Sequence, residues 1–364
     1  MRVQIDPRRT TPGQATAGEP VTVVITGAAG AVGTRVVRRL KRDMGEIDIR
    51  AVDRLAVGAG DGVKVKTADL SVDDLTSVFA GATTIVHLAT TVYPDVDDPS
   101  ATDLELAIVR RVLDAASHVG VDHVVVLSTA MVYGAWVGNP VPLTEEAMVR
   151  PNPEFGWANL RAAVEVLTLE WGQAPDRVAS VLRPTALVAD DALGQLARVL
   201  HAARIGIAAE GDPPVQYLHV DDLAGAISTV ISSRFDGVAN VAPDGWIPPD
   251  SLADLEGPTA RVRVPSWVAR SIAALRSRAG LSPIPPGIVP YTSHSWVVAN
   301  DRLRTLGWRP NYSNEEAWVV SHEPNALDRL PARRRQELAL VVAGVGVAGL
   351  IAGIVITIRR LRRR

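Results

Sequence analysis

The chain has 364 residues, 47% of them apolar, which exceeds the usual size of one compact core and predicts one large domain or two coupled domains. It contains no cysteine, which excludes disulfides, thiolate metal sites and cysteine nucleophiles. The net charge of −2 combines +8 in residues 329–364 (nine Arg, one Glu) with −10 in residues 1–328. Because an acidic body binds nucleic acid poorly, we expect no nucleic-acid partner.

Residues 1–20 are polar and lack an apolar run, so we expect a flexible arm and no cleaved signal peptide. After them, short apolar runs alternate with helical patterns, which is typical of a parallel sheet with helices on both faces. The pattern predicts an α/β fold: a Rossmann-type doubly wound parallel sheet over 21–182 and a smaller substrate lobe over 183–328. The expected strands are 21–26, 49–53, 84–88, 121–128 and 179–182, and the expected helices 31–42, 102–118 and 156–172.

A glycine-rich loop, "TGAAGAVG" (26–33), joins the first strand to the first helix. Gly27 permits a tight turn, Gly30 lets the backbone approach a pyrophosphate, and Gly33 allows close packing of the helix on the strand. The helix N-terminus itself attracts phosphate. This context predicts a dinucleotide site.

Asp53 ends the next strand, where an acid accepts hydrogen bonds from both ribose hydroxyls and repels a 2′-phosphate. The sequence therefore favours NAD over NADP, although the adjacent Arg54 leaves NADP open. Asp69 and Leu70 follow a third short strand, and two roles are open for this pair. Either it lies beside the adenine, or Asp69 caps a helix over 71–79.

With these residues the chain resembles the extended short-chain dehydrogenase/reductase family, the NAD-dependent sugar epimerases and dehydratases, over roughly 21–320. The motifs that carry the resemblance follow the family's order: TGAAGAVG from Thr26, HLAT from His87, STAMVYG from Ser128, LRPTALV from Leu182, YLHVDDLAGAI from Tyr217, GVANVAP from Gly237 and LGWRPNYSNEEA from Leu306. The resemblance and the loop chemistry together imply these cofactor contacts: Gly27, Ala29, Gly30, Val32, Gly33, Asp53, Arg54, Asp69, Leu70, Leu88, Ala89 and Arg161.

The resemblance also implies three side chains around the nicotinamide: a Ser or Thr that orients the substrate oxygen, a tyrosine that moves its proton and a lysine that lowers the tyrosine pKa. Thr129 occupies the Ser/Thr position, with a threonine that caps its own loop as the alternative. The tyrosine and lysine are expected in Y-x-x-x-K-x-x-x-E. The best register places Trp157 for the tyrosine and Arg161 for the lysine, and keeps Glu165.

These two replacements have different consequences. An indole N–H only donates and does not titrate, so Trp157 cannot exchange a proton. General acid–base catalysis is worth about 10²–10⁴-fold, and its loss predicts that most turnover is absent. Arg161 keeps the positive charge and the ability to donate to ribose hydroxyls. Tyr93 and Tyr133 lie near the expected pocket and either could supply a phenol, although packing between the lobes is the favoured role for both.

A hydrophobic segment, 338–358, has 21 uncharged residues, enough to cross a hydrocarbon core of about 30 Å. A basic linker (329–337) precedes it and a basic tail (359–364) follows, so the sequence predicts a single-pass transmembrane helix. Gly349 and Gly353 form G-x-x-x-G, a weak signal for a homodimer. Because NAD is cytoplasmic and no export signal precedes the body, we expect the body to face the cytoplasm. The arginines, four before and five after the segment, do not decide the side reached by the tail.

Three functional hypotheses remain open. The first is a membrane-anchored NAD(H)-binding protein without the standard chemistry. The second is an active epimerase, dehydratase or reductase with a non-standard acid–base group, acting on a small molecule such as a nucleotide sugar. The third is a non-catalytic small-molecule sensor or scaffold. No metal-ligand spacing is found, so no metal is expected.

Overall fold

The computed structural model describes residues 21–322, except 46, 56, 59, 61, 94–98, 191, 258–260 and 280–283. The predicted arm (1–20), basic linker (329–337), transmembrane helix (338–358) and basic tail (359–364) therefore lie outside the described residues. Within the described part of the chain, no helix combines the length and the apolar character needed to cross a bilayer.

Seven parallel strands form the central sheet, in the order β11-β6-β5-β4-β1-β2-β3. The order reverses between β1 and β4, and such a switch point opens a crevice for ligands at the carboxyl ends of the strands. The strands are β1 (Thr22–Thr26), β2 (Asp48–Asp53), β3 (Val63–Thr67), β4 (Thr84–His87), β5 (His123–Leu127), β6 (Val178–Pro184) and β11 (Gly237–Val241). The predicted Rossmann-like parallel sheet is confirmed.

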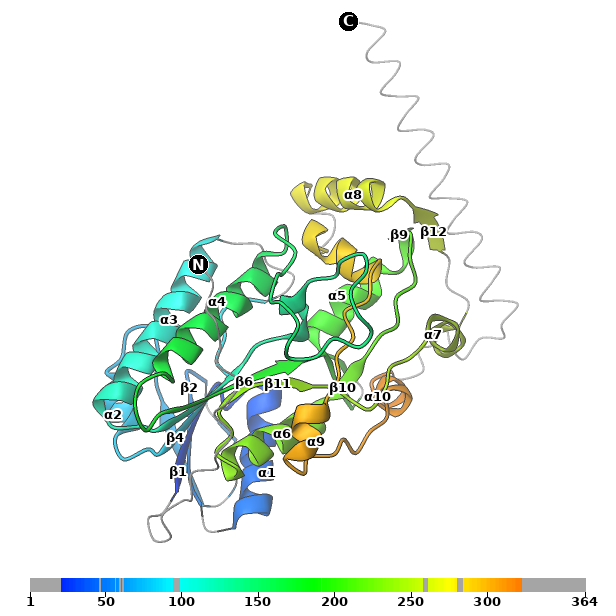
Figure 1. The fold of residues 1–364 in the computed structure, drawn as a ribbon. Helices are drawn as coiled ribbons and strands as arrows, with labels where there is room; N and C mark the ends of the chain where they lie inside the picture. The colour runs from blue at the N-terminus through cyan, green and yellow to red at the C-terminus, as the bar shows by residue number, and fades with distance from the viewer. Residues whose placement is uncertain are drawn as a thin grey trace, which may run out of the picture.

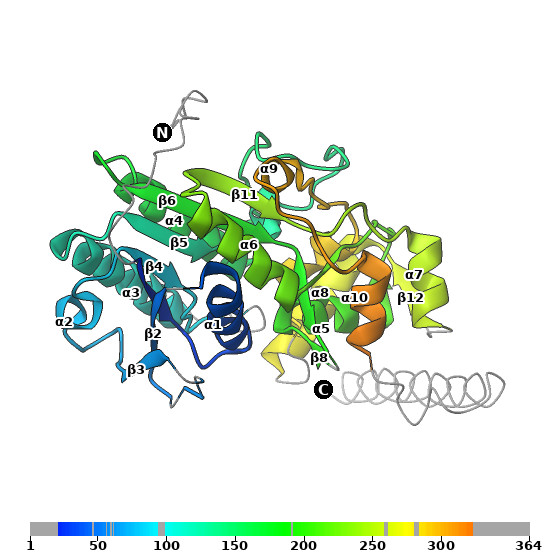
Figure 2. The ribbon, with the colours of Figure 1, turned by 90° about the horizontal axis from the view of Figure 1, so that it is seen from below.

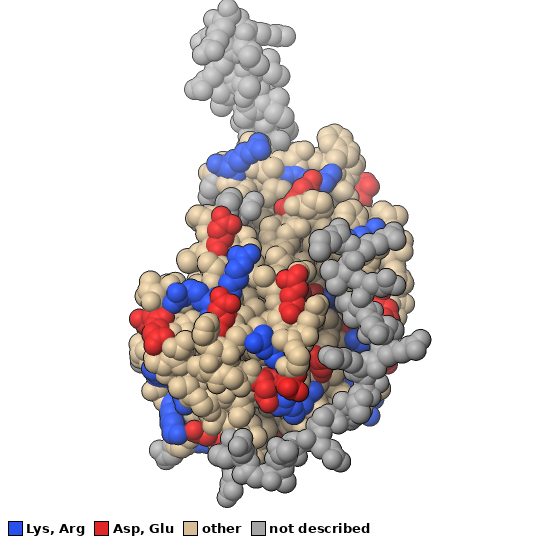
Figure 3. Space-filling view, turned by 60° about the vertical axis from the view of Figure 1, so that its left-hand side comes forward, with Lys and Arg blue, Asp and Glu red and all other residues tan. Residues whose placement is uncertain are grey.

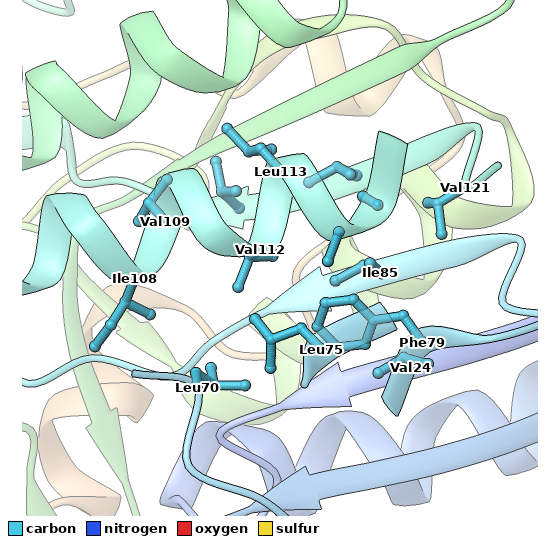
Figure 4. Close-up of a cluster of buried hydrophobic side chains, with 14 of the residues drawn as sticks. Val24, Leu70, Leu75, Phe79, Ile85, Ile108, Val109, Val112, Leu113 and Val121 are labelled. Atoms are coloured by element: carbon cyan, nitrogen blue, oxygen red, sulfur yellow. The ribbon is translucent and has the colours of Figure 1, made fainter. Parts of the chain in front are cut away.

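Helices cover both faces of this sheet (Figure 1, Figure 2). One face carries α1 (Ala31–Met44) and α6 (Val220–Ser232), and the other α2 (Leu75–Phe79), α3 (Pro99–His118) and α4 (Gly156–Trp171). Strand β1 shows why both faces need cover, because all five of its residues are buried. Val23 packs in the cluster under α1 and α6, whereas Val24 packs with Phe79 and Val112 under α2 and α3 (Figure 4).

A smaller lobe follows from β7 onward. Its core joins buried side chains of η1 (Ala130–Tyr133) and α4 to the later elements, so the lobe packs on the segments that carry the candidate site. It contains a sheet of order β10-β7-β8 and a β12-β9 pair. Its elements are β7 (Ala186–Ala189), β8 (Ala192–Leu193), α5 (Gln195–Ala203), β9 (Gly206–Ala209), β10 (Tyr217–His219), α7 (Pro249–Glu256), β12 (Arg261–Val264), α8 (Ser266–Arg278), η2 (Pro286–Thr292) and α10 (Asn314–Val320). The remaining helix, α9 (Asp301–Thr305), packs on β11 of the central sheet.

Charged side chains are mixed on the face drawn in Figure 3. Acidic and basic groups alternate over the described residues of that face, with no broad patch of one sign.

Candidate functional site

The glycine-rich loop lies at the switch point, between β1 and α1. Gly27 has a φ of +72°, and a Cβ at this position would lie 2.5 Å from the backbone nitrogen of Ala89. A Cβ on Gly33 would lie 2.3 Å from the carbonyl oxygen of Gly27. Both positions therefore require glycine, one for the turn and the approach to the loop after β4, the other for packing of α1. Gly30 is exposed at the N-cap, and no side chain caps α1.

The first turn of α1 is thus open to a ligand. Ala29 and Val32 flank Gly30 and are half-buried along the same turn. The uncapped N–H groups and the helix dipole favour an anion here, as the sequence predicts for a pyrophosphate.

Asp53 lies at the carboxyl end of β2, next to this loop. Its carboxylate accepts hydrogen bonds from the backbone N–H of Ala29 (3.0 Å) and of Leu55 (3.1 Å). The acid therefore holds the loop against β2 and remains half-exposed, in the position expected for a ribose-binding acid. Arg54 is exposed, 3.9 Å from the carboxylate of Asp69.

Asp69 and Leu70 follow β3, as the sequence indicates. The Asp69 carboxylate accepts from the backbone N–H (2.9 Å) and the hydroxyl (2.6 Å) of Ser71, and these bonds lower the Asp69 pKa. The expected helix over 71–79 begins only at Leu75, where Asp74 is the N-cap. Asp69 is therefore not the helix cap, because the chain makes a turn before the helix, while its contact with adenine stays a prediction.

The loop after β4 faces the glycine loop. Leu88 and Ala89 are half-buried, and the backbone of Ala89 is the nearest neighbour of Gly27. The structure thus brings Gly27, Asp53 and Ala89 to one edge of the sheet, where the sequence predicts the dinucleotide.

Thr129 follows β5 and is 1% exposed. Its hydroxyl accepts from the backbone N–H of Met131 at 3.3 Å and caps the short helix η1. The capping alternative is therefore confirmed, while contact with a substrate oxygen stays a prediction. Ser128, which the sequence analysis passed over, has a buried hydroxyl without a hydrogen-bond partner in the described structure.

Trp157 lies in the first turn of α4, where the sheet core and the lobe core meet. Its half-buried indole packs against both hydrophobic clusters. The ring centroid lies 5.9 Å from that of Phe155 and 5.7 Å from the guanidinium carbon of Arg161, within cation–π range. No phenol takes the place of this indole on α4.

Arg161 is turned into the protein. It donates to the hydroxyl of Thr90 (2.6 Å), and its other terminal nitrogen lies 3.5 Å from the carboxylate of Glu105. The residues Arg161 and Glu105 are 8% and 1% exposed. Glu105 also accepts from the backbone N–H (2.7 Å) and hydroxyl (2.9 Å) of Thr91. The positive charge of Arg161 is therefore balanced by Glu105, and the guanidinium is held beside the loop after β4.

Glu105 is the site residue that the sequence analysis missed, although the sequence contains a signal for it. The acid lies on the buried side of α3, four residues before Val109, where an amphipathic helix otherwise places apolar side chains. A buried acid requires a partner, and the structure supplies Arg161 from α4.

Glu165, the retained acid of the motif, has a structural partner. Arg183 of β6 donates to both carboxylate oxygens (2.8 and 2.6 Å) and to the hydroxyl of Tyr133 (2.7 Å). Tyr133 in turn donates to the side-chain oxygen of Asn240 (2.8 Å). Tyr133 is buried and packs in the lobe core, which confirms the packing interpretation, and this burial raises its pKa to about 12.

Two other groups complete the surroundings. Tyr93 is exposed, three residues after Thr90, and its proposed role as a substitute phenol stays a prediction. His87, at the end of β4, shares a hydrogen bond of 2.8 Å between its Nδ1 and the hydroxyl of Thr26. Burial, partly offset by the Glu105 carboxylate, lowers the His87 pKa to about 4, so this imidazole is neutral at pH 7.

Asp190, His219 and Asp221 form a group that the sequence analysis did not foresee. Their potential ligand atoms lie within 4.8 Å of one another, with His219 Nε2 at 3.6 Å from Asp190. Arg35 of α1 lies 3.2 Å from Asp221 and already supplies the positive charge that a cation would bring.

Comparisons with known proteins agree with this geometry. The family model described as "NAD dependent epimerase/dehydratase family" matches residues 23–242. Among curated proteins, a 3-diazoavenalumate denitrifying reductase of Streptomyces sp is 28% identical over 80% of this chain and 96% of its own. An uncharacterized protein of Mycobacterium tuberculosis (strain H37Rv) is 25% identical over 82% of each chain.

Solved structures share the fold. MoeE5 in complex with UDP-glucuronic acid and NAD has a TM-score of 0.62 at 20% identity, covering 82% of this chain and 97% of its own. The UDP-glucose 4-epimerase of Thermus thermophilus, in complex with NAD, has a TM-score of 0.62 at 22% identity, covering 84% and 100%.

Proposed function

The chain belongs to the NAD-dependent epimerase/dehydratase family, and from this premise we propose that it is a membrane-anchored NAD(H)-binding protein that lacks the family's tyrosine–lysine proton transfer. The observation that carries the proposal is the state of the two motif positions on α4. Position 157 holds an indole, and the cation at position 161 is bound internally by Glu105 and Thr90.

The cofactor half of the proposal rests on the switch-point loop. Gly27 and Gly33 allow the tight turn and the close packing that shape this loop, exposed Gly30 would let the backbone approach a pyrophosphate, and the uncapped first turn of α1 attracts an anion. Asp53 would hold the adenine ribose and disfavour a 2′-phosphate, which supports NAD over NADP. NAD(H), when bound, supplies a hydride acceptor or donor at its nicotinamide ring.

The missing chemistry follows from the protein's own groups. Trp157 can donate a hydrogen bond but cannot accept a proton, so it cannot generate or quench a substrate alkoxide. Arg161 is never neutral, and its contacts with Thr90 and Glu105 compete with any contact to the nicotinamide ribose. Binding and orientation are therefore retained, whereas proton transfer is lost.

Anchoring is proposed from the sequence of residues 338–358, which lie outside the described residues. Their 21 uncharged residues suffice for one crossing, and the NAD-binding body would face the cytoplasm. In this arrangement the protein would act as a sensor, a scaffold or a partner subunit that responds to NAD(H).

A second candidate is an active reductase, which the Streptomyces relative favours because its name describes a reductase and the alignment covers 96% of its length. Hydride transfer to an acceptor that already carries a positive charge needs no proton from position 157: a C–H bond of the reduced nicotinamide breaks, the hydride forms a new bond to the acceptor, and the cofactor is oxidised to NAD⁺. The substrate would be a small molecule. The solved relatives that bind UDP-sugars favour nucleotide sugars as another substrate class, and for these the exposed Tyr93 would supply the phenol that exchanges the proton.

The test uses the full-length protein in detergent. NADH and NADPH are titrated by fluorescence, and UDP-glucose conversion is followed in the unmodified protein and in W157Y/R161K with and without E105Q. Because Glu105 would also hold a lysine at 161, we expect turnover only in the triple variant. Absence of NADH binding would refute the proposal, and strong turnover in the unmodified protein would favour the second candidate.

A further inference from the structure

Helix α8 presents its largest apolar side chains to the outside. Ala269 and Ala273 face inward, where they pack with Ala209 and Val289. Trp267 and Leu275 face outward and are 68% and 70% exposed. A helix that only served the lobe core would bury its tryptophan and leucine and expose its alanines.

The outward residues form a line along the helix. Trp267, Ser271 and Leu275 follow one another at intervals of four residues and are all exposed. Val262 of the preceding strand β12 is also 64% exposed. Single exposed apolar residues are ordinary on a protein surface, but three large ones within one strand–helix segment are not.

The charge of α8 is entirely positive. The helix contains three arginines and no acid. Arg270 binds both oxygens of Glu154 (3.1 and 2.9 Å), whereas Arg276 and Arg278 are exposed in the last turn and form no ion pair with a described residue. At about 100° per residue Arg278 lies on the same side of the helix as Trp267 and Leu275, whereas Arg276 lies on the opposite side. We define the α8 face as Trp267, Ser271, Leu275 and Arg278.

We propose that the α8 face lies against the headgroups of an anionic membrane; the inference rests on the proposed membrane anchor. Tryptophan and leucine insert at the boundary of headgroups and acyl chains, and arginines bind the lipid phosphates. An amphipathic helix with this composition lies parallel to the bilayer, which fits an outer helix with a line of exposed residues.

The end of the described chain supports this occupant. The rings of His322 and of His201 on α5 have centroids 5.8 Å apart, and α5 and α8 both pack on η2. The described chain therefore ends in the lobe that carries α8. Helix α8 lies at the outer end of this lobe, away from β1 (Figure 1). Residues 323–337, which separate His322 from the hydrophobic segment, span about 50 Å at most. The anchor thus keeps this lobe within reach of the bilayer.

Docking of α8 would also orient the candidate site. The Arg270–Glu154 bond ties α8 to the residue before Phe155, the N-cap of α4. Helix α4 carries Trp157 and Arg161 one turn apart. The face of the lobe that docks on the bilayer would therefore be connected, through the Arg270–Glu154 bond, to the start of α4.

The absence of cysteine permits a direct test on the full-length chain. A single thiol is introduced by Ser271→Cys, which keeps Trp267 and Leu275, and is labelled with an environment-sensitive fluorophore. The control is Val72→Cys, on a loop of the sheet domain that is 74% exposed. Both proteins are reconstituted into vesicles of phosphatidylcholine and phosphatidylglycerol, and association is checked by flotation.

We expect a nitroxide-bearing lipid to quench the label at 271 and not at 72, and aqueous iodide to do the reverse. Iodide quenching at 271 equal to that at 72 would overturn the inference. Protection from both quenchers would overturn it in favour of a protein partner or a second copy. Flotation without lipid quenching refutes this inference alone, whereas failure to float refutes the anchor as well.

Neutralising the charge of the face tests the lipid class. In R278Q carrying the same label, the ratio of docked to undocked α8 should fall roughly fivefold on anionic vesicles. NADH affinity should not change, because Arg278 does not lie at the cofactor loop. Equal lipid quenching of the unmodified face on pure phosphatidylcholine vesicles would contradict the anionic assignment.

Discussion

At the residue scale, the buried cation Arg161 is compensated by a buried acid, Glu105. Arg161 and Glu105 come from neighbouring helices, and the threonines after β4 bond to one terminal nitrogen of Arg161 and to one carboxylate oxygen of Glu105. Burial lowers the Arg161 pKa and Glu105 raises it again. The guanidinium keeps its charge in either case, and Glu105 supplies the compensating negative charge. The pair fixes α3, α4 and the loop after β4 together.

Glu105→Gln should therefore lower the free energy of unfolding by about 3–5 kcal/mol, because it leaves the Arg161 charge buried without compensation. The control is Asp103→Asn, an exposed acid two residues earlier on α3, which should change stability by about 0.5 kcal/mol or less. Urea unfolding at pH 7 measures both. Equal stability of the two variants would contradict the assigned role of Glu105.

At the element scale, the β1–α1 unit has the features on which the proposed dinucleotide binding depends. Its strand is buried on both faces, its turn needs a left-handed residue, and its helix starts without a side-chain cap. Each feature is a local consequence of the residues in 22–33, and the loop after β4 completes the cradle from outside the unit. Because Gly27 has no side chain, its backbone can lie directly against that of Ala89.

Gly27→Ala should abolish NADH binding, since its Cβ would lie 2.5 Å from the Ala89 nitrogen. Gly45→Ala, at the end of α1, is a matched control: φ is also positive (+59°), but nothing lies within 4 Å of its Cβ. We expect this control to lose about 1–2 kcal/mol of stability and to keep its NADH affinity. NADH binding by Gly27→Ala comparable to the control would exclude the loop as the site.

At the scale of the whole molecule, two buried histidines link stability to pH. His87 and His123 lie on adjacent central strands, β4 and β5, and burial lowers their pKa values to about 4 and about 3. In the unfolded chain a histidine has a pKa near 6.5. Below about pH 6.5 the unfolded state therefore binds protons that the folded state does not. The contribution of the two histidines to the unfolding free energy is fully present above this pH and is lost progressively as the pH drops toward 4.

The unfolding free energy should decrease between pH 6.5 and 4 by up to about 1.4 kcal/mol per pH unit for each histidine. His123→Gln should remove one such contribution and flatten the profile. His118→Gln, at the exposed end of α3, should leave the slope unchanged. Urea titrations across this range provide the measurement, and parallel profiles for all three proteins would show that the buried histidines carry no linkage.

The sequence alone determined the parallel sheet and the glycine loop with Asp53, and it predicts the replacement of the family's tyrosine and lysine at 157 and 161. These features depend on periodicity and on motif spacing along a short stretch of chain. Only the tertiary structure decided which acid holds Arg161, that Tyr133 is a buried phenol bound to Arg183, and that the tryptophan of α8 faces outward. The physical reason is that a buried charge or an exposed ring is defined by neighbours from distant segments, and spacing within one segment carries no information about them.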